Sequence, residues 1–290
     1  MLHRISFWKA DFEVNRTKRR DSKHKKRRAH ILLFAAVSLS ILLIISLVML
    51  TIILVNYGQD QKLYREARAL AVKTNEPVQT AAPASSSPVA SILPAPTETP
   101  PILIDFEAVR KKGPNVLAWL YSTDTLINYP VVIYGDNSHY LTHDYTGSHS
   151  SSGALFFDCR LSKQLTDQNL IIYGHHMKNR SMFGNLLQYQ KQSYYDEHPT
   201  MYLLTPEKNY RIDLFAAQFT DSDEKFFPIW FESEQKRQAF VQAAIANSTF
   251  TPDDASYRTD GQIISLVTCA YSDYIEDAKF QVNGWLTEIG

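Results

Sequence analysis

The sequence contains very little cysteine and no internal repeat. Cys159 and Cys269 are the only two cysteines among 290 residues. Secreted folds that depend on several disulfides normally carry more, so the sequence argues against a disulfide-stapled scaffold. One bridge between these two residues stays open on this count alone.

The net charge of the chain is zero, but only because the opposite charges of two parts of the chain cancel. Lys and Arg number 30, and so do Asp and Glu. Residues 1–29 hold eleven basic and three acidic residues, a net charge of +8, whereas residues 30–290 hold 19 basic and 27 acidic residues, a net charge of −8. The excess of positive charge is therefore confined to an N-terminal tail.

A segment without charge, proline or glycine follows this tail. It covers Ile31–Val55 and exceeds the roughly 20 residues that a helix needs to cross a bilayer. A cleaved signal peptide would have an apolar core of about 7–15 residues and a small-residue cleavage site, which Asn56 and Tyr57 do not provide. We predict a basic cytoplasmic tail at 1–30, a signal-anchor helix in the membrane lipid bilayer at 31–56, and an extracellular remainder. Because this topology explains the basic run, nucleic acid is not expected as a partner.

Two regions follow the predicted span. Residues 57–101 are expected to form a stalk and a linker, because Pro77–Pro101 holds seven of the thirteen prolines, no glycine, and too little apolar surface to fold. Residues 102–290 alternate short β-rich, aromatic runs with polar turns, which is typical of a mostly-β barrel or sandwich with inserted helices. The predicted helices are Asp105–Lys112, Met182–Tyr189 and Glu232–Asn247. The predicted strands are Pro130–Tyr134, Ala154–Asp158, Leu170–Tyr173, Met201–Leu204, Tyr210–Thr220, Ile263–Thr268 and Lys279–Leu286.

Two of these predicted apolar strands lead directly into residues with reactive side chains. Ile263–Thr268 leads into Cys269, and Asn169–Tyr173 leads into Gly174 and His175. We expect Gly174 to permit a sharp turn that directs His175 back across the strand ends. An imidazolium lowers the pKa of a neighbouring thiol and later protonates the leaving group. A pair of Cys269 and His175 would therefore support nucleophilic catalysis.

Two other interpretations compete with this pair. A free thiol such as Cys269 is more often a buried structural residue. A metal site would take His175 and His176 as ligands, with His143 as a third, but no E-x-x-H or similar spacing accompanies them. We therefore do not expect a metal site.

Several segments in order carry a more specific pattern. They are Val116–Val132 (VLAWLYSTDTLINYPVV), His139–Gly147 (HYLTHDYTG), Gly153–Arg160 (GALFFDCR), Asn169–Gly184 (NLIIYGHHMKNRSMFG) and Ile263–Tyr271 (IISLVTCAY). Their order and spacing resemble the sortase family over about residues 102–286. The predicted helix between the two late strands is similar to the insertion that marks class B.

This resemblance implies an eight-stranded sortase β-barrel and a cysteine transpeptidase of Gram-positive cell surfaces. Such an enzyme cleaves a C-terminal sorting motif of a secreted protein, often of the Asn-Pro-x-Thr type in class B, and passes the acyl group to a peptidoglycan amine. By motif position, Cys269 is the nucleophile that forms the thioester and His175 the acid/base, while His176 falls at a variable position. The resemblance implies no cofactor and no metal.

One position departs from the family pattern. Sortases place an Arg on the strand after the nucleophile, and the aligned residue here is Lys279. Lys keeps the charge but loses the planar fork that holds a substrate carbonyl and an oxyanion together. Lys279 would do a reduced version of the job, or Arg180 or Arg258 would reach the site from a loop, or the domain is a slow or inactive sortase. The intact pair of Cys269 and His175 argues against the last alternative.

Other functions remain as alternatives to wall anchoring. A pilin-polymerising sortase would use a Lys of another subunit as the acceptor, and a tethered module would only bind sorting signals. A cysteine L,D-transpeptidase would need a Ser-His-Gly-Cys block, which Leu266–Cys269 does not supply. Cys159 is expected to be a small apolar filler, because a disulfide to Cys269 would extinguish the nucleophile.

Overall fold

The computed structural model describes the backbone of residues 3–74, 98–221, 226–253, 258, 260–269 and 277–290. Side chains are described for the same residues except 3–30, Thr74 and Cys269. The chain divides into two compact units, Met1–Asn56 and Tyr57–Gly290.

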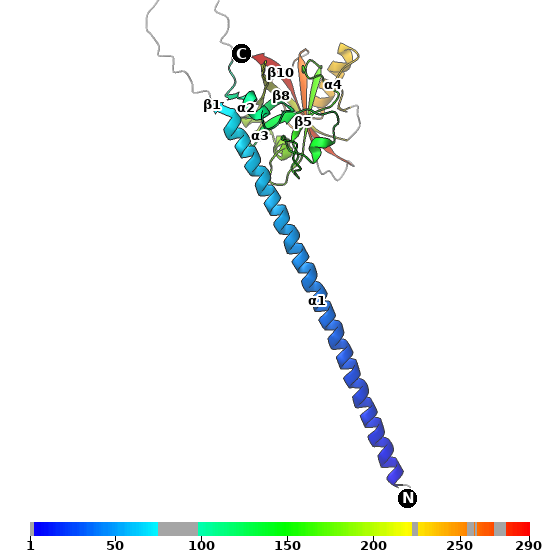
Figure 1. The fold of residues 1–290 in the computed structure, drawn as a ribbon. Coiled ribbons are helices and arrows are strands. Elements are labelled where there is room, and N and C mark those ends of the chain that lie inside the picture. Colours follow the sequence, from blue (N-terminus) through cyan, green and yellow to red (C-terminus); the bar gives the residue numbers. More distant parts are fainter. Residues whose placement is uncertain (1–2, 75–97, 222–225, 254–257, 259, 270–276) are drawn as a thin grey trace, which may run out of the picture. The chain divides into compact units, whose positions relative to one another are not determined.

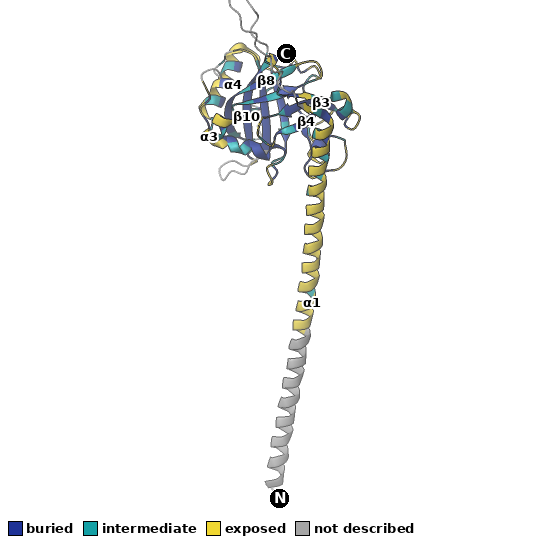
Figure 2. Ribbon diagram, turned by 90° about the vertical axis from the view of Figure 1, so that its left-hand side faces the viewer, coloured by how far each residue is buried: buried dark blue, intermediate teal, exposed yellow. Residues whose placement is uncertain are grey.

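The first unit is helical. It holds the first part of α1 (His3–Ala71), and Ile31–Ala71 is, within the described residues, the one stretch of helix long and apolar enough to cross a membrane. Its aliphatic side chains from Ile31 to Val55 are exposed (Figure 2). The hydroxyls of Ser40 and Thr51 donate to carbonyls one turn back, at 2.9 and 2.8 Å, as polar groups in lipid require. This helix is a candidate single-pass membrane anchor.

The second unit is built on eight strands that close into a barrel in the order β10-β8-β7-β3-β4-β5-β6-β9 (Figure 1). Neighbouring strands are antiparallel, except that β4 with β5 and β6 with β9 are parallel. The eight-stranded barrel predicted from the resemblance is confirmed. The barrel strands are β3 (Val116–Tyr121), β4 (Asn128–Val132), β5 (Leu155–Phe157), β6 (Asn169–Gly174), β7 (Thr200–Leu204), β8 (Asn209–Thr220), β9 (Gln262–Cys269) and β10 (Lys279–Ile289). The other elements are β1 (Val72–Thr74), β2 (Ile102–Ile104), α2 (Phe106–Arg110), η1 (His139–Leu141), η2 (Phe183–Gln190), α3 (Gln192–Glu197) and α4 (Glu234–Ala246).

Two of these strands, β6 and β9, are buried on both faces. Leu170 of β6 and Leu266 of β9 belong to the barrel core, whereas Ile171 and Val267 pack outside it against Phe227. Parallel strands covered on both faces are apolar at consecutive positions instead of alternating. This is why both segments read as continuous apolar runs in the sequence.

Helix α4 covers another part of the barrel's outer surface. Its Val241 and Ala244 are buried in one cluster with Phe215 of β8 and Trp285 of β10. Ser233 caps the helix, because its side chain accepts a hydrogen bond from the backbone N–H of Lys236 at 3.3 Å. The helix predicted between the two late strands is thus present, between β8 and β9.

The part of α1 that belongs to the second unit packs against the barrel. Tyr64, Ala67 and Ala71 are buried in the main core. The Tyr64 hydroxyl donates to the carbonyl of Gly153 at 2.6 Å, which ties the helix to the loop before β5. Residues 75–97, which include most of the predicted linker, lie outside the described residues.

Three elements differ from the expectations. Val116–Tyr121 forms β3, which pairs with β4 and β7 and was not predicted as a strand. The short helix predicted near Met182–Tyr189 is a 3-10 helix that buries Phe183 and Leu186, and α3 follows it directly. Both helices are short and depend on tertiary contacts, so their local sequence carries little signal.

Gly174 is required for packing instead of for a turn. Positive φ occurs among the described glycines only at Gly147, Gly153 and Gly261, so Gly174 keeps an ordinary backbone conformation. A Cβ at position 174 would overlap Leu155 and lie 2.8 Å from the Phe183 ring. The prediction of a sharp turn at this glycine is therefore wrong.

Gly174→Ala should lower the free energy of unfolding by about 1–3 kcal/mol, because the added methyl overpacks the core beneath the end of β6. Urea denaturation of the full chain in detergent would measure this. Gly135→Ala is the matched control, since a Cβ there has no heavy atom within 4 Å. Equal stability of the two variants would contradict the close packing.

Candidate active site

Three predicted site residues lie at one end of three neighbouring strands. The last residue pair in the parallel pairing of β6 with β9 is Gly174 with Thr268. His175 and Cys269 come directly after these two residues, so their backbones lie at the same end of the strands. Cys269 in turn pairs with Lys279, the first residue of β10. The backbone register thus gathers the three positions, although the side chain of Cys269 lies outside the described residues, as do residues 270–276.

A cleft of about 320 Å³ lies beside this end of the strands, and we call it the strand-end cleft. It is lined by Tyr173 of β6, Val267 of β9 and Lys279 of β10. Its other lining residues are Asn137, Asp158, Cys159, Arg160 and Phe227. Lys279 therefore lies in a cavity large enough for part of a peptide.

One wall of the strand-end cleft is a segment that approaches from outside the barrel. Three side chains donate to its consecutive carbonyls at Phe226–Pro228, namely Gln281, Arg160 and Asn169, at 3.1, 3.1 and 2.8 Å respectively. Side chains of three different barrel segments thus hold this wall. These hydrogen bonds also satisfy polar groups that would otherwise be buried without a partner.

A buried carboxylate organises the floor of the cleft. Asp158 accepts two hydrogen bonds from the Arg160 guanidinium, at 2.9 and 2.8 Å, and one from the Tyr173 hydroxyl at 3.0 Å. Burial by itself would raise the pKa of Asp158, but the hydrogen bonds and charge of Arg160 outweigh it and lower that pKa. Burial and the neighbouring carboxylate raise the pKa of Tyr173. Arg160 is thereby held as a charged fork with 41% of its side chain exposed.

The ring of His175 has a defined orientation. Its Nε2 lies 2.6 Å from the carbonyl oxygen of Leu141. A carbonyl only accepts, so Nε2 carries the proton and Nδ1 is the nitrogen left to exchange a proton with a thiol. The adjacent His176 forms a β-bridge with Met182, and burial lowers its pKa, which favours a neutral ring.

The two alternative arginines do not line the strand-end cleft. Arg258 donates to Asp213 at 2.7 Å and to Thr287 at 2.8 Å. Asp213 pairs with Trp285, six residues along β10 from Lys279 and thus roughly 20 Å away. Arg180 is exposed, in the loop after His176. The interpretation that Arg258 reaches the site is therefore wrong.

The remaining candidates occupy other places. Cys159 is a half-buried free thiol that lines the strand-end cleft, and its backbone N–H donates to the Asn137 side chain at 2.7 Å. His143 stacks on His139 with ring centroids 4.2 Å apart. Among the residues that the structure describes, no group of three His, Cys, Asp or Glu side chains is placed to hold a metal ion.

Asp158, Arg160 and Tyr173 were not predicted as site residues from the sequence. Two features of the sequence could have identified these residues. Asp is favoured at the start of a turn, where its side chain accepts from the backbone two residues on, as Asp158 does from the N–H of Arg160 at 3.0 Å. Tyr173 lies two residues before the predicted catalytic His175.

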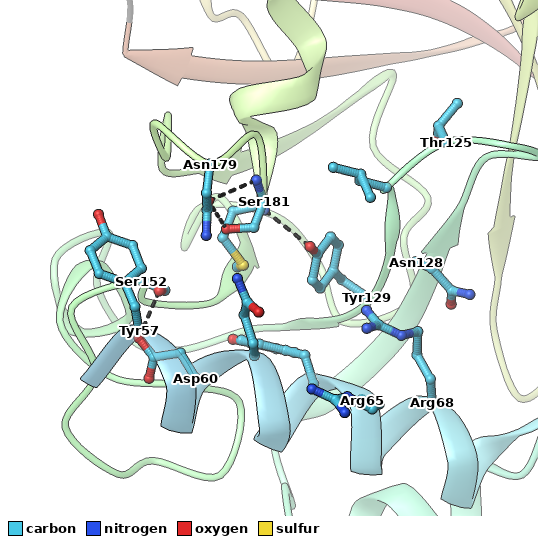
Figure 3. Close-up of a pocket in the computed structure, with 14 residues that line it drawn as sticks. Tyr57, Asp60, Arg65, Arg68, Thr125, Asn128, Tyr129, Ser152, Asn179 and Ser181 are labelled. Atoms are coloured by element: carbon cyan, nitrogen blue, oxygen red, sulfur yellow. Dashed lines mark hydrogen bonds between the residues drawn. The ribbon is translucent and has the colours of Figure 1, made fainter. Parts of the chain in front are cut away.

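A second cleft, of about 330 Å³, lies within the second unit between α1 and the barrel loops (Figure 3), and we call it the helix-side cleft. Neither His175 nor Lys279 lines it. The lining residues are Tyr57, Asp60, Gln61, Tyr64, Arg65, Arg68, Thr125, Leu126, Asn128, Tyr129, Ser152, Asn179, Ser181 and Met182.

Solved structures show what the fold resembles. A structure of the Staphylococcus aureus sortase B–substrate complex has a TM-score of 0.59 and 26% identity, over 64% of this chain and 85% of that one. Sortase B from Bacillus anthracis in complex with AAEK1 has a TM-score of 0.64 and 23% identity, over 81% of this chain and 99% of that one, and at that identity it supports the fold alone.

Sequence comparison extends the likeness beyond the fold. No family model matches the chain. Sortase B of Listeria monocytogenes is 30% identical over 178 residues, which cover 61% of this chain and 72% of that protein. Sortase B of S. aureus is 30% identical over 170 residues, 58% of this chain and 69% of that protein. With this identity over more than two thirds of both relatives, and with the same barrel, the chain belongs to the class B sortases, a family of cysteine transpeptidases.

Proposed function

We propose that this class B sortase is a membrane-anchored enzyme that cleaves a C-terminal sorting motif and transfers the acyl group to a cell-wall amine. The observation that carries the proposal is the meeting of Cys269, His175 and Lys279 at the ends of β9, β6 and β10. The substrate complex known for the S. aureus relative supports a sorting-signal peptide as the substrate class.

The thiolate of Cys269 attacks the carbonyl carbon of the scissile peptide bond. The tetrahedral intermediate collapses as His175 gives a proton to the leaving amine, and a thioester is left on the enzyme. The acceptor amine then attacks the thioester, His175 takes its proton, and a new peptide bond releases the thiolate.

Two cations in the cleft share the task of the family's single Arg. Lys279 lies at the family position and supplies charge where the oxyanion develops. Arg160 adds a second cation, which the ionised Asp158 and the Phe227 carbonyl hold in place through Nε and Nη2 before substrate arrives. The proposed role of Lys279 is thus a reduced version of the family's, with Arg160 as its helper.

The predicted topology places the proposed reaction on the outer side of the membrane. Residues 1–30 would lie in the cytoplasm, the helix at 31–56 would span the membrane, and the catalytic domain would lie outside. Of the predicted stalk and linker at 57–101, residues 57–74 are part of the folded second unit. Peptidoglycan precursor is the proposed acceptor. The presence of both Cys269 and His175 argues against a module that merely binds sorting signals, because a protein that only binds them would need neither residue.

Cys269→Ala and His175→Ala should each abolish acyl-enzyme formation, because one removes the nucleophile and the other its proton donor. The measurement is mass spectrometry of the full chain in detergent after incubation with a set of sorting-motif peptides. Cys159→Ala is the matched control and should still be acylated. An acyl group on Cys159, or none on any cysteine with any motif, would sink the proposed function.

Arg160→Lys should slow acylation by about 100-fold or more, because Lys cannot keep the bidentate hydrogen bonds to Asp158 that fix the cation in the cleft. Lys279→Arg should leave the rate unchanged or raise it. Single-turnover acylation rates would report both.

Arg258→Lys is the control for the arginine substitutions, since it alters an ion-paired guanidinium outside the cleft. Its acylation rate should match that of the unaltered chain. If Arg160→Lys acylates at the normal rate while Lys279→Arg is slow, Lys279 acts alone and the helper role of Arg160 is wrong.

A further inference from the structure

The helix-side cleft concentrates positive charge in a part of the chain that is negative overall. Residues 30–290 hold 19 basic and 27 acidic residues, yet Arg65 and Arg68 of α1 both line this cleft. Within the described part of the chain, the acidic residues nearby in sequence pair elsewhere, Glu66 with Lys62 and Lys112, and no ion pair to either arginine is present. Like charges that share a cleft repel each other, so an anionic occupant would stabilise them.

The one carboxylate among the lining residues is already engaged. Asp60 accepts hydrogen bonds from the hydroxyls of Ser150 and Ser152 at 2.9 and 2.7 Å. These bonds fasten α1 to the loop before β5 (Figure 3). These bonds fix Asp60 in the docking of the helix, and two arginines against this one carboxylate leave the lining of the cleft with a net positive charge.

Arg68 is held against the wall of the cleft. Its guanidinium carbon lies 5.9 Å from the centre of the Tyr129 ring. The Tyr129 hydroxyl accepts a hydrogen bond from the backbone N–H of Met182 at 3.2 Å, so the ring itself is fixed. Arg65 lies three residues earlier on α1 and therefore on the same side of the helix. The two guanidinium groups present donors from one wall.

Two amides present donors from the other walls. The Asn128 side-chain oxygen accepts from the indole N–H of Trp119 at 2.7 Å. The Asn179 side-chain oxygen accepts from the backbone N–H and the hydroxyl of Ser181, at 3.1 and 2.6 Å. In both residues the acceptor end is used within the protein, which leaves the NH₂ end as the group for a ligand. The cleft is therefore lined mainly by donors.

We propose that the helix-side cleft is a binding site for a phosphate-bearing ligand. Arg and amide donors on several walls suit the oxygens of a phosphate, which accept from more directions than a planar carboxylate. The cavity of about 330 Å³ is far larger than a phosphate group, and Tyr57, Leu126 and Met182 offer apolar surface. The ligand is thus a phosphate attached to a larger body, either a soluble sugar phosphate or the headgroup of an anionic lipid.

An occupant of this site would contact the loop that follows the proposed catalytic histidine. Asn179 and Ser181 lie between His176 and Met182, which close the loop through a β-bridge. Arg180 and Met182 both have positive φ, which is costly for residues with a Cβ and is common at functional sites. Binding itself does not depend on the proposed reaction, so the two proposals can fail separately.

The test uses the full chain in nanodiscs of phosphatidylcholine, titrated calorimetrically with inorganic pyrophosphate and with glucose 1-phosphate. Both probes should bind. The double variant Arg65→Gln with Arg68→Gln should weaken binding by about tenfold or more, and the corresponding double Lys variant should fall between. Lys62→Gln removes one positive charge from an exposed site on the same helix outside the cleft, and its affinity should stay unchanged.

The same titration in nanodiscs that also contain phosphatidylglycerol separates the two sources of phosphate. At a salt concentration that screens the surface potential of the nanodisc, weaker binding of the soluble probes there would identify a lipid headgroup as the competing occupant, and unchanged binding would identify a soluble ligand. Either result supports the site. Absence of binding in phosphatidylcholine nanodiscs, or equal affinity in the double Gln variant, would overturn it, whatever the acylation assay shows.

Discussion

Six residue pairs join β6 to β9 in parallel, from Asn169 opposite Ile263 to Gly174 opposite Thr268. Parallel strands need a crossover connection, and here it contains β7, β8 and α4. The pairing therefore brings together the ends of two segments that lie more than 90 residues apart in sequence. The positions of His175 and Cys269 follow from this register, and a slip by one residue would send every side chain of the slipped strand to the other face.

The strand-end cleft lies where the segment around Phe227 packs on the outer face of β6 and β9. The segment beginning at Phe226 forms its wall, and barrel side chains including Asn169 hold that wall through its carbonyls. Asp158 is buried below it and is ionised because Arg160 and Tyr173 compensate the loss of water. A charge fixed in advance in a partly dry cleft acts more strongly on a developing oxyanion than a mobile charge in water.

Helix α1 meets two different environments along its length. From Ile31 to Val55 its aliphatic side chains are exposed and suited to lipid, and its hydroxyls bond within the helix. After Tyr57 it contributes Tyr64 to the barrel core and forms one wall of the helix-side cleft. The same helix is thus a candidate anchor in one unit and part of the folded domain in the other.

The sequence by itself determined the apolar segment at 31–55, the mostly-β class, and the two strands that lead to His175 and Cys269. These features are local, because each follows from the composition or periodicity of one continuous segment of the sequence. Only the tertiary structure decided that Gly174 is needed for packing against Leu155, that Arg258 belongs elsewhere, and that Arg160 shares a cleft with Lys279. Each of these depends on residues brought together by strand pairing, and such distant contacts leave no periodic trace in a single sequence.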